Sequence, residues 1–211
     1  FDGFKQYLQS KNLASTVVEN RPLEMSIPQQ EPSDNKQWTI GYIGRVRELK
    51  TFTLMLEAIK LIPLIERPKI IIAGDGIRAK EVHQLMMNEV ESGEIEAEVS
   101  GAFTSGQFQK LVRQLDVMFA LYPPNRGNIS QGALPVKMFD AAANGVPSIV
   151  NSDCLMGELA EIEEIGRAVA WDDAQAACNA LLELRGTIVE LRITSQREKE
   201  KFLSTVLPLL D

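Results

Sequence analysis

Basic side chains and one carboxylate occur where a folded chain could gather them around a small anion. Arg45 and Lys50 follow an apolar run early in the chain, and Lys137 and Asp140 follow a polar, glycine-bearing loop at residues 123–135. Arginine offers an anion a planar fork of donors, whereas lysine offers a point charge. The loop also leads into a helix start, whose unpaired amides and partial positive charge favour phosphate. This arrangement fits a diphosphate in charge and in length.

Strands and helices alternate along the chain and would position these residues. Short, continuously apolar runs bounded by Gly or Pro predict strands. These runs are residues 38–43, 69–73, 97–100, 117–121, 147–150 and 168–171. Apolar residues at helical spacing predict helices at 51–62, 79–90, 105–115 (capped by Ser105), 136–144, 157–165 and from 173 to the end. We therefore expect an α/β fold, a Rossmann-like doubly wound parallel sheet of about six strands.

Ligands of such sheets bind beyond the carboxyl ends of the strands, so the residues that follow each strand are the candidates. Gly44 follows the first strand, a Gly-Asp-Gly sequence at 74–76 the second, and Ala102 and Phe103 the third. On its own, the Gly-Asp-Gly sequence is typical of an ordinary tight turn. No Gly-x-Gly-x-x-Gly pattern follows the first strand, which disfavours a dinucleotide cofactor. His83, the only histidine, is expected to be structural or solvated.

The composition restricts the classes of partner. The 211-residue chain has a formal net charge of -7, which disfavours nucleic acid, because phosphate backbones need a basic face. No apolar run reaches the ~18 residues of a membrane span, and no secretory signal pattern opens the chain. The two cysteines predict neither a disulfide framework nor a metal cluster. We expect a cytoplasmic protein, or one peripheral to the inner face of a membrane.

Four segments of the chain, in order, resemble segments of one enzyme family. Residues 44–50 are similar to its Gly-Arg-Leu-x-x-x-Lys segment, and residues 70–76 to the turn after its second strand. Residues 99–117 are similar to its third-strand and fourth-strand stretch. Residues 134–147 resemble its Pro-x-Lys-x-x-Glu-x-x-Ala-x-Gly-x-Pro helix and turn. The family is the retaining GT-B glycosyltransferases of the glycogen-synthase-like and sucrose-synthase-like group, and the resemblance extends over residues 38–184.

The resemblance implies a role for several residues. Arg45 and Lys50 would be the catalytic cations, neutralising the diphosphate of a nucleotide-diphosphate sugar as it leaves. Asp140 would stand where the family has a Glu that accepts hydrogen bonds from both ribose hydroxyls. Ala102 and Phe103 would meet the nucleobase. The remaining donor-binding residues that it implies are Gly44, Pro135, Val136 and Lys137.

The resemblance also implies a domain organisation and an activity. Residues 1–36 would be the tail of a missing N-terminal domain, with a short helix at 4–13 and a linker at 26–36, and residues 37–211 the nucleotide-sugar-binding domain with C-terminal helices. The full-length protein would be a glycosyltransferase of the hexosyltransferase type, acting in polysaccharide biosynthesis without a metal or other cofactor. An acceptor glycan or lipid-linked saccharide would bind through the missing domain. We expect the 211-residue chain alone to be inactive.

Two positions depart from the family pattern. The family carries a second Glu eight positions before the residue that matches Asp140, and this position is Gly132, which has no side chain to contact the donor sugar. Asp140 is itself shorter than Glu by one carbon–carbon bond, about 1.5 Å. These departures favour one alternative, a non-catalytic nucleotide-sugar-binding or interaction domain. A sugar-nucleotide epimerase of the same architecture is a further alternative. The single histidine disfavours the epimerase, which needs further acid–base residues near the diphosphate.

Overall fold

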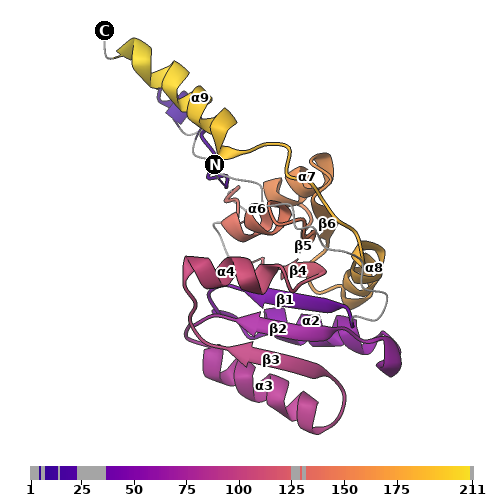
Figure 1. Ribbon diagram of the computed structural model, residues 1–211. Helices are drawn as coiled ribbons and strands as arrows, with labels where there is room; N and C mark the ends of the chain where they lie inside the picture. The colour runs from indigo at the N-terminus through magenta and orange to yellow at the C-terminus, as the bar shows by residue number, and fades with distance from the viewer. Residues whose placement is uncertain are drawn as a thin grey trace.

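The computed structural model describes residues 5, 8–13, 15–22, 37–124, 129 and 132–209. Within these residues the chain forms a six-stranded, all-parallel sheet with the strand order β3-β2-β1-β4-β5-β6 (Figure 1). The strands are β1 (Thr39–Ile43), β2 (Lys69–Ala73), β3 (Glu96–Ser100), β4 (Val117–Ala120), β5 (Ser148–Asn151) and β6 (Gly166–Val169). The expected doubly wound α/β fold is therefore confirmed.

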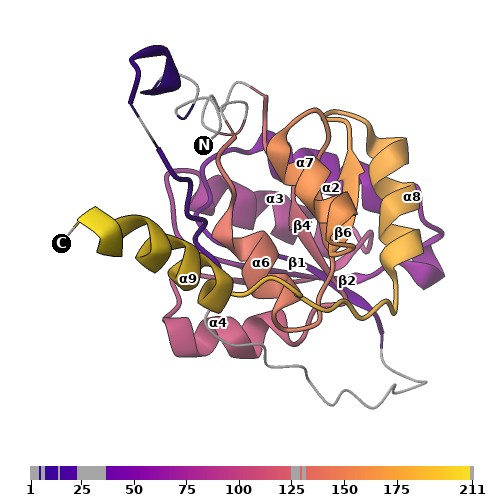
Figure 2. The ribbon, with the colours of Figure 1, turned by 90° about the horizontal axis from the view of Figure 1, so that it is seen from above.

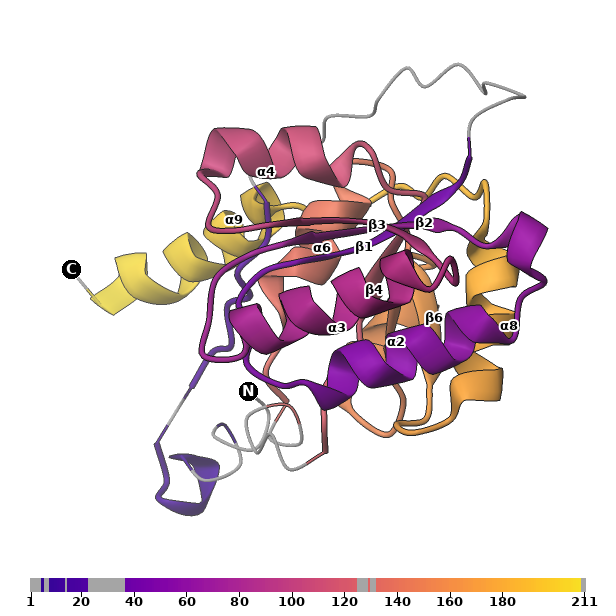
Figure 3. The ribbon, with the colours of Figure 1, turned by 90° about the horizontal axis from the view of Figure 1, so that it is seen from below.

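Helices cover both faces of the sheet. The helices are α2 (Lys50–Lys60), α3 (Ala79–Glu91), α4 (Ser105–Val112), α6 (Val136–Ala142), α7 (Leu155–Ile162), α8 (Ala174–Leu184) and α9 (Ser195–Val206), with short 3-10 turns η1 (Leu64–Glu66) and η2 (Leu207–Leu209). Helices α2, α3 and α8 lie on one face, and α4 and α6 lie on the other (Figure 3). The helix α7 contributes its buried residues to the same core as α4 and α6.

The central strands are apolar on both sides because both of their faces are covered. In β1, Ile40 joins the core under α2, α3 and α8, whereas Ile43 joins the core under α4, α6 and α7. In β4, Phe119 joins the core under α2, α3 and α8, and Met118 joins the core under α4, α6 and α7. All four residues are almost fully buried. Continuous burial of this kind is the reason that parallel strands appear in a sequence as unbroken apolar runs.

The order of the strands reverses between β1 and β4. The chain builds β1, β2 and β3 outward in one direction and then returns to place β4 on the other side of β1, with Ile40 paired to Val117. The turns after β1 and β4 lead to helices on opposite faces, because α2 and α6 contribute to different cores. In open α/β sheets, ligands bind beyond the carboxyl ends of the strands at this point of reversal.

The region from residue 173 to the end, expected to be helical, forms α8 and α9 with an irregular segment between them. Helix α8 ends at Leu184, and Gly186 follows with a φ of 73°, a conformation that glycine adopts without strain. The chain then returns to the domain, where Val189 donates a hydrogen bond from its N–H to the carbonyl of Gly145 and Leu191 is fully buried. Burial of these two apolar side chains interrupts the helix until α9 begins.

Smaller differences arise from local capping. The N-cap of α4 is Thr104 and not Ser105, because the Thr104 hydroxyl accepts from the Gln107 amide while the Gln107 side chain accepts from the Thr104 amide. The expected last strand begins two residues early, at Gly166. The reason is that α7 ends at Ile162 and Glu164 turns the chain with a φ of 56°.

Residues 15–22 lie against α9, although the two segments are distant in sequence (Figure 2). The backbone amide of Glu19 donates to the Glu198 carboxylate at 2.8 Å, and the amide of Ser195 donates to the carbonyl of Pro22 at 3.0 Å. Within the short helix expected at 4–13, residues 5 and 8–10 are helical among those that the structure describes; the linker expected at 26–36 lies outside the described residues.

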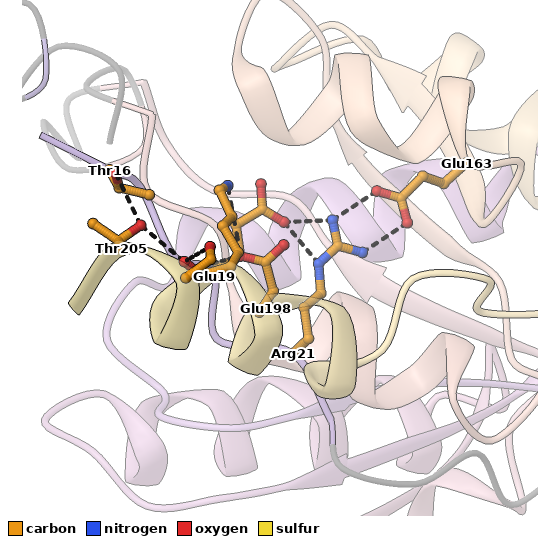
Figure 4. Close-up of polar contacts among 8 residues, drawn as sticks. Thr16, Glu19, Arg21, Glu163, Glu198 and Thr205 are labelled. Carbon is orange, nitrogen blue, oxygen red and sulfur yellow. Dashed lines mark hydrogen bonds and ion pairs between the residues drawn. The ribbon is translucent and has the colours of Figure 1, made fainter. Parts of the chain in front are cut away.

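Arg21 joins this N-terminal segment to the domain (Figure 4). Its guanidinium donates two hydrogen bonds of 2.7 Å to the carboxylate of Glu163 and two more to a carboxylate oxygen of Glu19. It also lies 3.8 Å from the centroid of the Phe139 ring in α6. Arg21 is only 5% exposed, so a buried and fully paired cation fixes residues 15–22 against α6 and the end of α7.

Candidate functional site

The turn after β1 is held in place by the turn after β2. The parallel pairing of the two strands continues beyond their ends, because the Gly44 amide donates to the Ala73 carbonyl and the Val46 amide donates to the Asp75 carbonyl. A Cβ atom on Gly74 would lie 1.8 Å from the carbonyl oxygen of Gly44. The Gly-Asp-Gly sequence is therefore more than a tight turn: its glycines let the two loops approach closely.

Arg45 projects from this turn into solvent. Its side chain is 64% exposed and its Nε lies 3.8 Å from a carboxylate oxygen of Asp75, which is 61% exposed. Such exposed pairs are worth between about 0 and 1 kcal/mol, so the guanidinium can turn to an anionic ligand at little cost. The backbone of Arg45 is fixed more firmly, because its carbonyl accepts a hydrogen bond of 2.9 Å from the Tyr42 hydroxyl.

Lys137 places a buried ammonium group behind the same turn. Its Nζ lies 3.5 Å from the centroid of the Tyr42 ring and 5.0 Å from that of Tyr122. A Cβ atom on Gly44 would lie 3.5 Å from this Nζ. Aromatic faces attract cations, so the two tyrosines hold the charge next to the backbone of Gly44. Tyr122 is itself fixed by reciprocal hydrogen bonds of 2.8 Å between its backbone and the side-chain amide of Asn151.

Asp140 lies one helical turn beyond Lys137 on α6. Burial raises the pKa of its carboxyl to about 6. Within the described part of the chain, no side chain donates a hydrogen bond or forms an ion pair to this carboxylate. A half-buried carboxylate without protein donors is suited to accept hydrogen bonds from a ligand, which would also lower its pKa.

Lys50, the first residue of α2, lies on the other side of the sheet edge. Its side chain is exposed and lines a hollow of about 480 Å³ between the start of α2 and the ends of β4 and β6. No ion pair to its ammonium occurs among the described residues. The structure therefore brings Gly44, Arg45 and Lys137 together at the strand-order reversal, with Lys50 and Asp140 flanking them on opposite faces of the sheet.

The other predicted site residues lie farther along the same edge. Ala102 is exposed and Phe103 is half-buried after β3, two strands away from β1, and the Phe103 ring centroid is 6.0 Å from that of Phe108. Pro135 precedes α6 as its N-cap, and Val136, 37% exposed, is its first residue. Helix α6 has seven residues, shorter than the predicted 136–144. Residues 125–128, 130 and 131 of the loop at 123–135 lie outside the described residues.

Three aromatic residues near these side chains were not predicted from the sequence. Tyr42 and Tyr122 hold the Lys137 ammonium, and Trp171 lines the hollow beside Lys50. Each lies at or just beyond the carboxyl end of a strand, at β1, β4 and β6. Their position in the sequence could have indicated them, because an aromatic residue at the end of an apolar run points either into the core or toward a ligand.

The described residues offer neither a metal-binding cluster nor a membrane-spanning helix. No group of three or more His, Cys, Asp and Glu side chains there could hold a metal ion, and the expectation of a metal-free site stays a prediction. None of the helices within that part of the chain has the length and apolar character required to cross a membrane.

Comparison with known proteins connects this geometry to a family. Residues 25–187, more than half of the chain, match the family described as glycosyl transferases group 1. The chain belongs to this family. Its fold and its strand-order reversal are those of one half of a GT-B glycosyltransferase. A search of curated proteins found no match.

Solved glycosyltransferase structures share the fold at low sequence identity. The pneumococcal O-GlcNAc transferase GtfA in complex with UDP and GlcNAc aligns with 100% of this chain and 44% of its own, with a TM-score of 0.64 and 13% identity. The lipopolysaccharide outer core galactosyltransferase WaaB aligns with 96% of this chain and 60% of its own (TM-score 0.63, 15% identity). Anabaena HepE in complex with UDP aligns with 82% and 49% (TM-score 0.56, 16% identity). The chain thus spans between 44% and 60% of these three relatives.

Proposed function

We propose that this chain is the donor-binding half of a glycosyltransferase and holds the diphosphate of a nucleotide-diphosphate sugar at the turn after β1. The observation that carries the proposal is the meeting of Gly44, Arg45 and the Lys137 ammonium at the strand-order reversal. Membership of the family supports it, as does the UDP bound in the structures of HepE and GtfA. An acceptor glycan or lipid-linked saccharide would be bound by a second domain.

The cations are placed to act on the leaving group. When the bond between the anomeric carbon and the diphosphate breaks, negative charge grows on the departing oxygen. Arg45 and Lys50 would contact the phosphates, while Lys137 would stabilise the same charge from behind Gly44. Positive groups that are already in position stabilise such a transition state without reorganisation, and no metal ion is required. Retention of the anomeric configuration, which the sequence resemblance implies, is part of this proposal.

The carboxylate of Asp140 would accept hydrogen bonds from the ribose hydroxyls. Its partial burial and the absence of donors from the described residues support this role. The exposed Ala102 and the Phe103 ring would lie next to the nucleobase, since they follow the strand two places beyond β1. The donor would then lie along the carboxyl edge of the sheet, from β3 to the start of α6.

A non-catalytic binding domain is the second candidate, and the backbone at Gly132 favours it. Gly132 has a φ of 83°, a left-handed conformation that strains residues with a side chain. At the position of the family's other Glu, the backbone of this chain therefore has a conformation that suits glycine. A domain that binds a nucleotide sugar without transferring it would explain this loss.

Thermal unfolding of the chain with UDP, GDP, ADP and their sugars tests the donor site. A ligand at a hundred times its dissociation constant stabilises a protein by about 2.7 kcal/mol, which is a readily measured shift in Tm. We expect one nucleotide to stabilise the chain, and the effect to be lost in Arg45→Ala and Asp140→Ala. The absence of any shift would contradict the proposal. Product analysis on the intact protein then separates transfer from binding alone and gives the anomeric configuration.

A further inference from the structure

The hollow beside Lys50 is also lined by residues that take no part in the proposed donor site. It lies where the start of α2 meets the turns after β4 and β6, and its volume is about 480 Å³. Small-ligand sites occupy about 300–1,000 Å³ and combine apolar surface with a few polar groups. The side chains that give this hollow its chemistry are Glu48, Lys50, Arg78, Glu81, Pro124 and Trp171.

We propose that this hollow binds a pyranose ring, with the indole of Trp171 as its stacking platform. A sugar ring has an apolar face of C–H groups and a rim of hydroxyls. An aromatic face flanked by hydrogen-bonding side chains complements both parts. The inference rests on the proposed function in one respect, since Lys50 both lines the hollow and is proposed to contact the diphosphate.

The charges around the hollow favour a neutral, hydroxylated ligand. The two carboxylates of Glu48 and Glu81 balance the two cations of Lys50 and Arg78. Arg78 donates to both carboxylate oxygens of Glu81, at 2.7 and 2.9 Å, so these two groups are already neutralised by each other. A second phosphate or sulfate would find no net positive charge here. Hydroxyl groups, by contrast, can donate to the carboxylates and accept from the guanidinium.

Trp171 is held in a fixed position on this wall. It follows β6 directly and packs in part against the core formed with α2 and α8, while remaining half-exposed. Asp172 turns the chain after it with a φ of 67°, and the Asp173 side chain caps α8 by accepting from the Ala176 amide. A rigid aromatic platform loses little conformational entropy when it binds a ligand. Trp38, in contrast, is 5% exposed and its indole N–H donates to the Glu66 carbonyl.

The ring could come from either of two sources. The sugar of the donor is attached to the phosphate that Lys50 is proposed to contact, and Gly132 leaves that sugar without the contact expected from the family. A saccharide acceptor could also place one of its rings in the hollow. A ring from either source would contact Trp171 in the same way. The two sources are distinguished by which ligand, a nucleotide sugar or a free saccharide, binds more weakly when the Trp171 side chain is removed.

The test compares ligands that do and do not carry a pyranose. Calorimetric titrations of the wild-type chain, Trp171→Ala and Trp171→Phe use UDP, UDP-glucose, UDP-N-acetylglucosamine and maltose. We expect Trp171→Ala to weaken binding of at least one saccharide-bearing ligand by about five- to tenfold, and UDP binding by less than about twofold. Trp171→Phe keeps a flat ring and should retain most of the affinity. In the Trp38→Phe protein, Trp171 is the only indole and its fluorescence should change with the saccharide and not with UDP.

The outcomes of these titrations test the saccharide subsite and the donor site separately. An effect confined to the nucleotide sugars supports the subsite and assigns it to the donor sugar, whereas an effect on maltose alone supports it and assigns it to an acceptor ring. Normal UDP binding together with unchanged saccharide affinities in Trp171→Ala would overturn the subsite and leave the donor site intact. Failure to bind UDP, GDP and ADP alike would overturn the proposed function, and the maltose titration would then decide the subsite on its own.

Discussion

The ammonium of Lys137 lies 3.5 Å from the centroid of the Tyr42 ring and directly behind Gly44. This relationship connects α6, on one face of the sheet, to the turn that carries Arg45. A positive charge buried beside the backbone acts strongly on an anion in front of it, because little water screens the interaction. The Lys137 ammonium would therefore support the diphosphate site without being exposed to solvent.

We predict that Lys137→Met weakens UDP binding by about tenfold and changes stability much less. Methionine keeps the length of the side chain and removes the charge, and its sulfur can keep a favourable contact with the tyrosine rings. Urea unfolding and UDP titration measure the two effects. The same substitution at the exposed Lys199 of α9 should change neither. A Lys137→Met protein that binds UDP normally would exclude this role.

A second prediction concerns the pH dependence of stability. Burial raises the pKa of Asp140 to about 6 in the folded chain, above its value of about 3.9 in an unfolded chain. The stabilising contribution of this group is therefore fully present below about pH 4 and is lost as the pH rises through 6. We expect Asp140→Asn to be more stable than the wild type at neutral pH by about 1 kcal/mol, because solvent screens part of the effect on this half-buried group, and the difference should vanish near pH 4. A difference in stability between Asp140→Asn and the wild type that does not change with pH would contradict a raised pKa of Asp140.

The same carboxyl should make nucleotide binding depend on pH. A carboxylate accepts two hydrogen bonds from the ribose, whereas a protonated carboxyl accepts them less well. UDP affinity should then fall as the pH is lowered through 6, and Asp140→Asn should bind weakly at every pH. Titrations of both proteins between about pH 5 and 8 would show this. Parallel pH profiles for the two proteins would mean that Asp140 does not contact the ligand.

Arg21 is predicted to be a major source of stability for the N-terminal segment. Removing its side chain leaves the buried Glu163 without its partner, and breaking a buried ion pair in this way costs about 3–5 kcal/mol. Arg21→Ala should therefore lower the free energy of unfolding by about this amount and release residues 15–22 to proteolysis. Arg192→Ala is the matched control, because the Arg192–Glu164 pair is exposed. Equal effects of the two substitutions would show that Arg21 contributes no more than a surface pair.

Gly74 tests the contact between the two turns. In Gly74→Ala the new Cβ would lie 1.8 Å from the Gly44 carbonyl oxygen, at a φ of 153° that residues with a side chain rarely adopt. We predict a loss of at least about 2 kcal/mol in stability together with weaker UDP binding, since the turn that carries Arg45 must move. Gly106→Ala, in α4 with open space around it, should be neutral or stabilising by up to about 1 kcal/mol. Unchanged UDP binding in Gly74→Ala would show that the position of this turn does not matter for nucleotide binding.

The alternation of strands and helices could be predicted because it depends on local pattern. Continuous apolar runs identified β1, β2 and β4 within one or two residues of their ends. The C-terminal region could not be predicted in this way, because Val189 and Leu191 are ordered by burial against a distant part of the chain. A helical pattern of apolar residues does not reveal such long-range packing.

The candidate site was predictable in part. Residues that follow parallel strands meet at one edge, so Gly44 and Lys137 could be expected to lie close together from topology alone. The sequence did not reveal that tyrosine rings bury the Lys137 ammonium, because the direction of a long side chain depends on its neighbours in three dimensions. Arg21 likewise gave no signal, since its partner Glu163 is 142 positions away.

The most direct test of the central claim is a titration of wild-type and Arg45→Ala chains with the diphosphate and the monophosphate of the nucleotide that stabilises the chain, which are UDP and UMP if the base is uracil. If the turn after β1 holds the diphosphate, the wild type should bind UDP at least about tenfold more tightly than UMP, because the β-phosphate adds a charge-assisted contact. This difference should largely disappear in Arg45→Ala. Equal affinities of the wild type for UDP and UMP, or a preference for UDP that survives the substitution, would contradict the account.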